Sequence, residues 1–139
     1  MIEKPELDHI GIAVDSIDSG LAIYRSLGIE VQSVEEVADQ KVRVAFLPVG
    51  DTRIELLEPT DDTSPIARHL ERRGAGLHHI CLRVADVRAA MAQLSEEGYR
   101  LLSEEPVQGA HDCLVCFVHP KSAGGVLIEL SESIASYKS

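Results

Sequence analysis

Two segments of alternating apolar and polar residues open the two halves of the chain and predict β-strands. Residues 7–14 read Leu-Asp-His-Ile-Gly-Ile-Ala-Val, and residues 77–84 read Leu-His-His-Ile-Cys-Leu-Arg-Val. Side chains alternate between the two faces of a strand, so His9 and His79 both lie opposite the branched aliphatic residues of their strands. The pattern therefore recurs after about 70 residues with one histidine in the same register.

A second repeated segment closes each half. Residues 54–58 read Ile-Glu-Leu-Leu-Glu, and residues 128–132 read Ile-Glu-Leu-Ser-Glu. Glu55 and Glu129 alternate with the apolar residues of their strands, so each leaves the sheet on the side away from the aliphatic face, as the histidines do. That side of the sheet can line a cavity.

A helix pattern follows each opening strand. Asp15 or Ser16 is expected to cap the first helix, which ends at Gly28, and Asp86 to cap the second, which ends at Gly98. Three extended segments follow each helix, at 29–37, 41–48 and 52–58 in the first half and at about 99–103, 113–119 and 125–131 in the second. The predicted topology is βαβββ, twice.

A short helix over residues 66–73, begun by Pro65 and ended by Gly74, separates the halves. A chain of 139 residues, 45% hydrophobic, can bury one core, but modules of half that length seldom stand alone. We therefore predict a single α+β domain over the whole chain. In it two βαβββ modules, residues 7–59 and 76–132, form a cupped mixed β-sheet with flanking helices.

Bulk properties narrow the classes of function. No apolar run approaches 18 residues and the N-terminus has no apolar targeting core, which favours a cytoplasmic protein outside the membrane. A net charge of −10 disfavours binding to nucleic acid or to an anionic membrane, because both need a basic surface. Three cysteines do not resemble a disulfide framework, so structural thiols are expected.

The repeated histidines and glutamates predict a metal site. A carboxylate that points inward from a half-buried strand is costly unless it is paired or bound to a metal. Two such glutamates stand at matching positions beside two matching histidines, so we expect His9, Glu55, His79 and Glu129 to hold one divalent ion. The alternative is that His–Glu hydrogen bonds replace the metal and serve only packing.

Loop residues of the second half are candidates for contact with a substrate. Lys121 and Ser122 lie in a tight cationic turn between two strands, where the ammonium could pin a carboxylate or phosphate. A plain solvated turn fits the same sequence. His111 lies in a loop where it could cover a substrate, and a bare loop position is the alternative.

These motifs together resemble the methylmalonyl-CoA epimerases of the vicinal oxygen chelate superfamily, over residues 7 to 131. The fold and the metal are features of that superfamily. The His-Pro-Lys-Ser turn, the Gly-Val-Leu-Ile-Glu-Leu strand and the Leu-Glu-Pro-Thr-Asp-Asp-Thr-Ser-Pro-Ile linker favour the epimerases over glyoxalase I or the extradiol dioxygenases.

The resemblance implies interconversion of (2R)- and (2S)-methylmalonyl-CoA through an enolate, with Co²⁺ or a related Mn²⁺, Ni²⁺, Zn²⁺ or Mg²⁺ ion, usually in a homodimer. It implies the ligands His9, Glu55, His79 and Glu129, with Glu129 and Glu55 as the acid/base groups. Some members carry glutamine at the position of Glu55. Some also carry a catalytic glutamate on the third strand, where this chain has Val44 and no carboxylate, so the second acid/base group is open.

Two other functions fit the same pattern. One is a glyoxalase I-like lyase acting on a glutathione hemithioacetal through the same ligands. The other is a non-catalytic protein that binds a small molecule in its pocket. The matched pair of glutamates favours an enzyme, because a pure binding pocket needs no acid/base pair.

Overall fold

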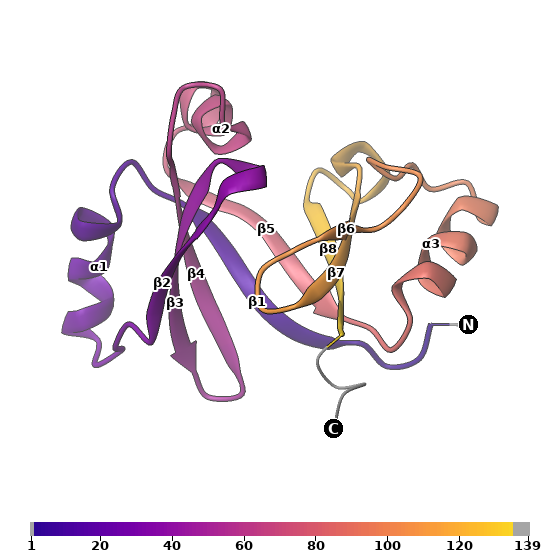
Figure 1. The fold of residues 1–139 in the computed structure, drawn as a ribbon, viewed down its shortest axis with the longest axis horizontal. Helices are drawn as coiled ribbons and strands as arrows, with labels where there is room; N and C mark the ends of the chain where they lie inside the picture. The colour runs from indigo at the N-terminus through magenta and orange to yellow at the C-terminus, as the bar shows by residue number, and fades with distance from the viewer. Residues whose placement is uncertain (1, 135–139) are drawn as a thin grey trace. The chain divides into compact units, whose positions relative to one another are not determined.

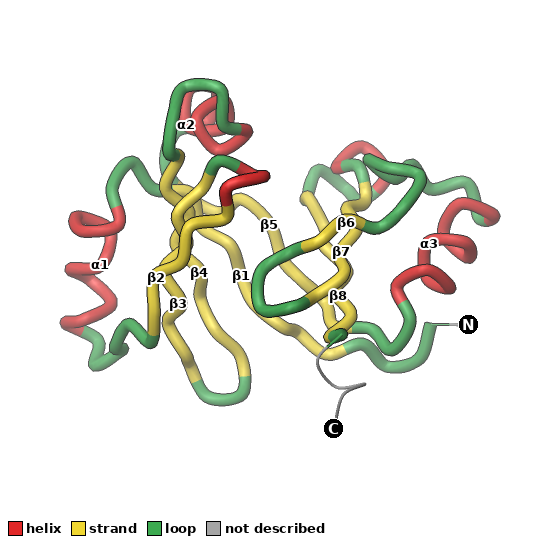
Figure 2. The backbone as a smooth tube through the Cα atoms, in the orientation of Figure 1, coloured by secondary structure: helices red, strands yellow, loops and turns green. Residues whose placement is uncertain are grey.

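The computed structural model describes residues 2–134, which fold into eight strands and three helices in the predicted order (Figures 1 and 2). The strands are β1 (Glu6–Ala13), β2 (Ser33–Val37), β3 (Val42–Val49), β4 (Thr52–Pro59), β5 (Gly76–Arg83), β6 (Val107–Gln108), β7 (Cys113–Val118) and β8 (Leu127–Ser133). The helices are α1 (Ile17–Ser26), α2 (Pro65–Arg73) and α3 (Val87–Glu96), with 3₁₀ turns η1 (Ala38–Gln40) and η2 (Pro120–Ser122). The α+β class and the doubled βαβββ order are confirmed.

The chain divides into two compact units of the same topology. Of the described residues, the first contains 9–78, and the second contains 2–8 together with 79–134. Strands of the first unit follow the order β2-β3-β4-β1, with β1 parallel to β4 and the other neighbours antiparallel. The second unit has the order β5-β8-β7-β6, with β5 parallel to β8 and the other neighbours antiparallel. The predicted mixed sheet is therefore present in each unit.

Helix α1 covers the core of the first unit. Its residues Ile17 and Leu21 pack against Leu47 and Leu56 of the sheet. The Ser16 side chain caps the helix, and Glu58 Oε1 accepts a hydrogen bond of 2.9 Å from the backbone N–H of Ile17. The helix is thus fixed to the closing strand of its own module through an otherwise unsatisfied N–H group.

Helix α3 repeats this arrangement in the second unit. Its residues Val87 and Met91 belong to a buried cluster with Cys116 and Leu130 of the sheet. The Asp86 side chain caps the helix. Glu132 Oε1 accepts a 2.8 Å hydrogen bond from the backbone N–H of Val87. The last glutamate of each closing segment is therefore a helix-capping group, which the alternation of the strands alone did not predict.

The start of the chain packs with the second unit. The backbone N–H of Ile2 donates a 2.8 Å hydrogen bond to Gln93 Oε1 on α3, and the Ile2 side chain packs against the core of that unit. Glu6 pairs with Arg83 of β5 at 3.2 Å. Ile2 and Glu6 come before the first module in the sequence but pack with the second unit. The order of the modules along the chain did not predict this contact.

One predicted strand is wrong. Residues 99–103 were expected to be extended, but only an isolated bridge from Leu101 to Val118 forms there, and the regular strand β6 begins at Val107. Pro106 has no N–H to donate, and Ser103 forms a local turn through a 2.6 Å bond to the Glu105 carbonyl. The first unit departs from its predicted strands mainly in that β2 begins at residue 33 instead of 29.

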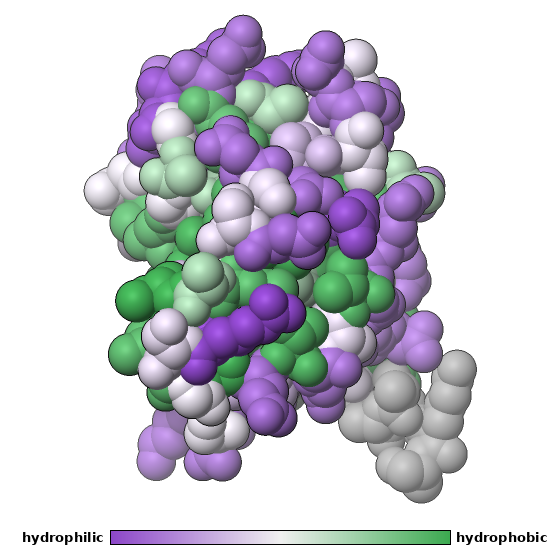
Figure 3. Space-filling model, turned by 90° about the vertical axis from the view of Figure 1, so that its left-hand side faces the viewer, coloured by the Kyte–Doolittle hydropathy of each residue, from purple (hydrophilic) through white to green (hydrophobic). Residues whose placement is uncertain are grey.

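The surface described by the structure is mixed in polarity. The face on which α1 lies carries apolar patches among charged groups (Figure 3), and Ile23 and Leu27 of this helix are 59% and 67% exposed. Among residues 2–134, none of the helices has the length and apolar character needed to cross a bilayer.

Candidate metal centre

Four ionisable side chains are buried at the repeat positions. His9 and Glu55 are 5% and 6% exposed, and His79 and Glu129 are 5% and 9% exposed. In the part of the chain that the structure describes, these are the buried histidines and carboxylates. Buried charge is costly unless it is paired or ligates a metal, so their burial calls for a partner at each position.

The first pair, His9 and Glu55, lies within the first unit. Strands β1 and β4 are parallel, and their register places Gly11, two residues after His9, beside Glu55. The small Gly11 leaves room on this face. His9 Nδ1 and Glu55 Oε2 are 3.1 Å apart.

The second pair, His79 and Glu129, has the same register within the second unit. Strands β5 and β8 are parallel, and Cys81, two residues after His79, lies beside Glu129. His79 Nε2 and Glu129 Oε1 are 3.0 Å apart. Each glutamate also has a phenylalanine opposite it on the antiparallel neighbour, Phe46 for the first pair and Phe117 for the second.

The histidine-bearing face of each opening strand is the more buried one. On β1, His9, Gly11 and Ala13 are buried, whereas Ile10 and Ile12 are half-buried. On β5, His79 and Cys81 are likewise buried, whereas Ile80 and Leu82 are half-buried. The aliphatic face of each opening strand packs with the helix of its own module, Ile12 with the cluster that contains Ile17 and Leu82 with the cluster that contains Val87.

The distance within the second pair fits two ligands of one ion. Bonds of about 2.1 Å at right angles in an octahedron place neighbouring ligand atoms about 3.0 Å apart, and His79 Nε2 and Glu129 Oε1 are 3.0 Å apart. In the first pair the 3.1 Å distance involves His9 Nδ1, which also faces a guanidinium, so Nε2 is the ring nitrogen left to ligate an ion. Imidazole nitrogen with carboxylate oxygen is a donor set suited to Co²⁺, Ni²⁺, Zn²⁺ or Mn²⁺. The same distances also suit a direct His–carboxylate hydrogen bond, so experiment has to separate a metal site from packing.

Arg53 is a neighbour of the first pair that the sequence interpretation missed. Its Nε donates a 2.8 Å hydrogen bond to Glu55 Oε2, and its Nη2 lies 3.4 Å from His9 Nδ1. The guanidinium also lies 5.6 Å from the centroid of the Phe46 ring. A signal was available, because Arg53 precedes Glu55 by two residues and therefore shares its face of β4.

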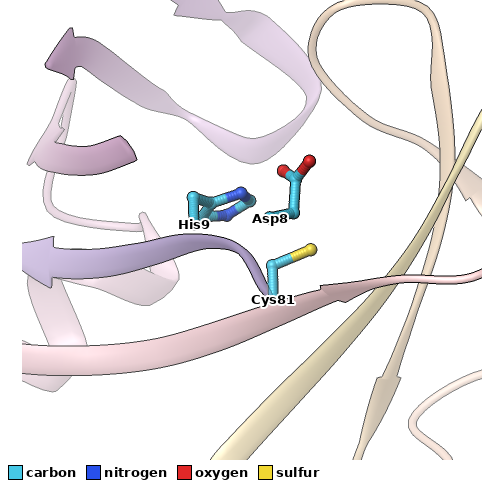
Figure 4. Close-up of side chains that lie close together, drawn as sticks. All are labelled: Asp8, His9 and Cys81. Carbon is cyan, nitrogen blue, oxygen red and sulfur yellow. The ribbon is translucent and has the colours of Figure 1, made fainter. Parts of the chain in front are cut away.

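Two further ionisable residues of the second unit, Asp8 and Cys81, lie close together. Asp8 and Cys81 point into a common region (Figure 4), with a carboxylate oxygen and the Cys81 Sγ within 4.8 Å of each other. Asp8 also pairs with Arg83 Nη1 at 3.7 Å.

Burial, together with the negative charge of nearby Glu129, raises the pKa of the Cys116 thiol to about 11. Cys116 is therefore a protonated core residue at neutral pH, as expected for a structural thiol.

The predicted substrate-contacting residues lie in loops. Lys121 is exposed in η2, where its backbone N–H donates to His119 Nδ1 at 3.0 Å. Ser122 Oγ accepts a 3.0 Å hydrogen bond from the backbone N–H of Arg100, so this hydroxyl has a structural role. His111 is exposed and has a left-handed backbone with φ of 55°. Contact of Lys121, Ser122 and His111 with a substrate stays a prediction.

Comparison with known proteins assigns the class. A family model described as Glyoxalase/Bleomycin resistance protein/Dioxygenase superfamily matches residues 8–117. The chain belongs to this superfamily, as its motifs and its doubled βαβββ fold indicated.

Its relatives within the superfamily include epimerases of acyl-CoA thioesters. The chain is 45% identical over 129 residues to the ethylmalonyl-CoA/methylmalonyl-CoA epimerase of Cereibacter sphaeroides, over 91% of this chain and 96% of that one. It is 41% identical over 129 residues to human mitochondrial methylmalonyl-CoA epimerase, over 91% of this chain and 73% of that one. A variant of Streptomyces coelicolor methylmalonyl-CoA epimerase, solved with 2-nitronate-propionyl-CoA, matches with a TM-score of 0.89 and 38% identity, over 96% of this chain and 97% of that one.

Proposed function

We propose that the protein interconverts (2R)- and (2S)-methylmalonyl-CoA with the help of one divalent metal ion. The observation that carries the proposal is the burial of His9, Glu55, His79 and Glu129 as two His–carboxylate pairs in the same register of two repeated modules. The identity of about 40% to methylmalonyl-CoA epimerases supports the substrate class.

All four residues would ligate the same ion. Imidazole nitrogens and carboxylate oxygens are donors that would hold a divalent transition-metal ion. When bound, a divalent ion supplies Lewis acidity that stabilises developing negative charge on the thioester oxygen. The neutral imidazoles of His9 and His79 and the two carboxylates would fix it in place.

Epimerisation needs a proton removed from one face of the α-carbon and one returned to the other face. Glu129 is the first candidate for the base, because a carboxylate can accept and return a proton. Glu55, at the equivalent position of the other module, is the candidate for the second group. Val44 is buried on β3 and carries no carboxylate, so that strand offers no other acid.

The substrate is proposed to be an acyl-CoA, with Lys121 as the cation that receives part of it. The solved relative holds 2-nitronate-propionyl-CoA, itself an acyl-CoA. A homodimer, a cytoplasmic location and Co²⁺ as the native metal belong to the same proposal. Light scattering, fractionation and elemental analysis of the purified protein address these three points.

The decisive experiment combines metal analysis with hydrogen exchange. We expect about one divalent ion per chain and metal-dependent loss of the α-proton of methylmalonyl-CoA in ²H₂O, followed by NMR. A parallel assay with the glutathione hemithioacetal of methylglyoxal tests a glyoxalase I-like activity. Turnover of the hemithioacetal, with no α-proton exchange in methylmalonyl-CoA, would show that the protein is a glyoxalase I-like lyase and not an epimerase. Binding of acyl-CoA without exchange would indicate a non-catalytic binding protein.

Variants of the histidines test the ligand set. The His9→Ala, His79→Ala double variant should lose the ion, whereas His69→Ala, which removes a half-buried histidine on α2, should keep it. Stoichiometric metal in the double variant would show that the pairs are hydrogen-bonded packing groups.

A further inference from the structure

Arg53 contacts both members of the first pair. Its Nε donates to Glu55 Oε2 at 2.8 Å, and its Nη2 lies 3.4 Å from His9 Nδ1. The guanidinium is planar, and its N–H groups point in fixed directions, so the two contacts together restrict both side chains. One rigid group thus spans a carboxylate and an imidazole that come from different strands.

The position of Arg53 is itself restricted. Its guanidinium lies 5.6 Å from the centre of the Phe46 ring, at a distance suited to a cation–π contact. Phe46 is fully buried and is the antiparallel neighbour of Glu55 in the register of β3 and β4. The Arg53 side chain is only 26% exposed. A flexible surface arginine would not hold its partners in this way.

The second module has no arginine at the equivalent position. Leu127 precedes Glu129 by two residues, as Arg53 precedes Glu55, and it lies beside His79 in the register of β5 and β8. Phe117 is the counterpart of Phe46. The two pairs therefore share their register and their aromatic neighbour, and an arginine in the first module stands where the second has a leucine.

We propose that Arg53 is a positioning residue of the first pair, and this inference rests on the proposed function in taking that pair as metal ligands. Arg53 donates to Oε2 of Glu55 and so orients the carboxylate, while its contact at His9 Nδ1 directs the other ring nitrogen, Nε2, to the ion. Partners of this kind around metal ligands set the affinity of a site, and their loss costs roughly 10- to 100-fold in metal binding. The orientation of the first pair, and through it the affinity for the ion, depends on Arg53.

The test is a metal titration of Arg53→Gln. We expect Co²⁺ to bind metal-free Arg53→Gln roughly 10- to 100-fold more weakly than the wild type, with a changed d–d absorption spectrum in the loaded protein. Arg43→Gln is the matched control, because it removes a guanidinium from the adjacent strand β3 that pairs with Glu58 at 3.0 Å. The control should bind Co²⁺ as the wild type does. Thermal unfolding of each metal-free variant reports any general loss of fold.

Arg53→Lys separates positioning from charge. Lysine keeps the positive charge but replaces the rigid planar guanidinium by one ammonium on a flexible stem, so it should restore neither the wild-type spectrum nor the full affinity. Wild-type affinity in Arg53→Gln, or complete rescue by Arg53→Lys, would overturn the inference. A wild-type protein that binds Co²⁺ but exchanges no α-proton would instead overturn the proposed function and leave the role of Arg53 standing.

Discussion

At the scale of single residues, two glutamates in one register have different surroundings. Glu55 is bonded to Arg53 at 2.8 Å, whereas Leu127 takes the equivalent place before Glu129. The two modules thus share a histidine and a glutamate in one register, while the residue two positions before the glutamate differs. In the proposed reaction Glu129 is the base, and Glu55 is the carboxylate that Arg53 orients.

The corresponding prediction is that Glu129→Gln keeps the metal and loses exchange. The amide oxygen can still ligate, but it accepts no proton, so α-proton exchange should fall by about 10²-fold or more. Glu55→Gln should be milder. Metal content and NMR in ²H₂O are measured on the same samples. Near wild-type exchange in metal-loaded Glu129→Gln would move the base to Glu55 or His111.

The Cys116 thiol predicts a loss of stability at alkaline pH. Burial raises its pKa to about 11 in the folded protein, whereas the unfolded chain has the ordinary value of 9.0. Above pH 9 the unfolded state loses this proton first, so stability falls as pH rises towards 11, by roughly 2–3 kcal/mol in total. Below pH 9 the thiol is neutral in both states and the contribution is constant.

Urea unfolding of the wild type and of Cys116→Ala at pH 8, 9 and 10 measures this effect. Other titrating groups act on both proteins, so the difference between the two profiles isolates the thiol. The difference should narrow with rising pH. Parallel profiles would contradict the raised pKa.

At the scale of elements, the alternation of apolar and polar residues and the helix-capping residues were sufficient to predict most of the strands and helices. The left-handed glycines that end α1 and α3, at φ of 86° and 93°, lie where the sequence predicted helix ends. The strand expected at 99–103 is absent, and residues 107–108 form β6 instead, because these are the residues that pair with β7. The local pattern of apolar and polar residues does not show which of the two segments forms this pairing. Arg53 was missed although it shares the face of Glu55, because the alternation pattern does not show which side chains of that face contact one another.

Glu132 provides a prediction at this scale. Its carboxylate accepts from the first N–H of α3 at 2.8 Å, so Glu132→Ala leaves a helix N-terminus without that partner and should cost about 1 kcal/mol. Chemical denaturation of the metal-free protein measures the loss. Glu104→Ala, at an exposed loop position, is the control and should be neutral. An equal effect of both changes would mean that only net charge matters.

At the scale of the whole molecule, net charge opposes the proposed substrate. The chain carries −10, and an acyl-CoA is a polyanion, so attraction must come from local cations such as exposed Lys121. Charge–charge attraction at the surface is screened over about 10 Å at 0.1 M salt and about 3 Å at 1 M. The contribution of Lys121 should therefore depend on ionic strength.

We predict that Lys121→Ala raises KM for methylmalonyl-CoA severalfold at low salt and leaves kcat nearly unchanged, because a loop ammonium would contribute mainly uniform binding of an anionic group. The difference in KM between variant and wild type should shrink as NaCl rises from 20 mM to about 1 M, as screening requires. Arg25→Ala on the last turn of α1 removes the same charge at another surface position, so it separates a local contact from the change in net charge. If both variants raise KM alike, the long-range field of the protein governs substrate capture and Lys121 is a solvated turn residue. A lower kcat with unchanged KM would instead place Lys121 in the chemical step.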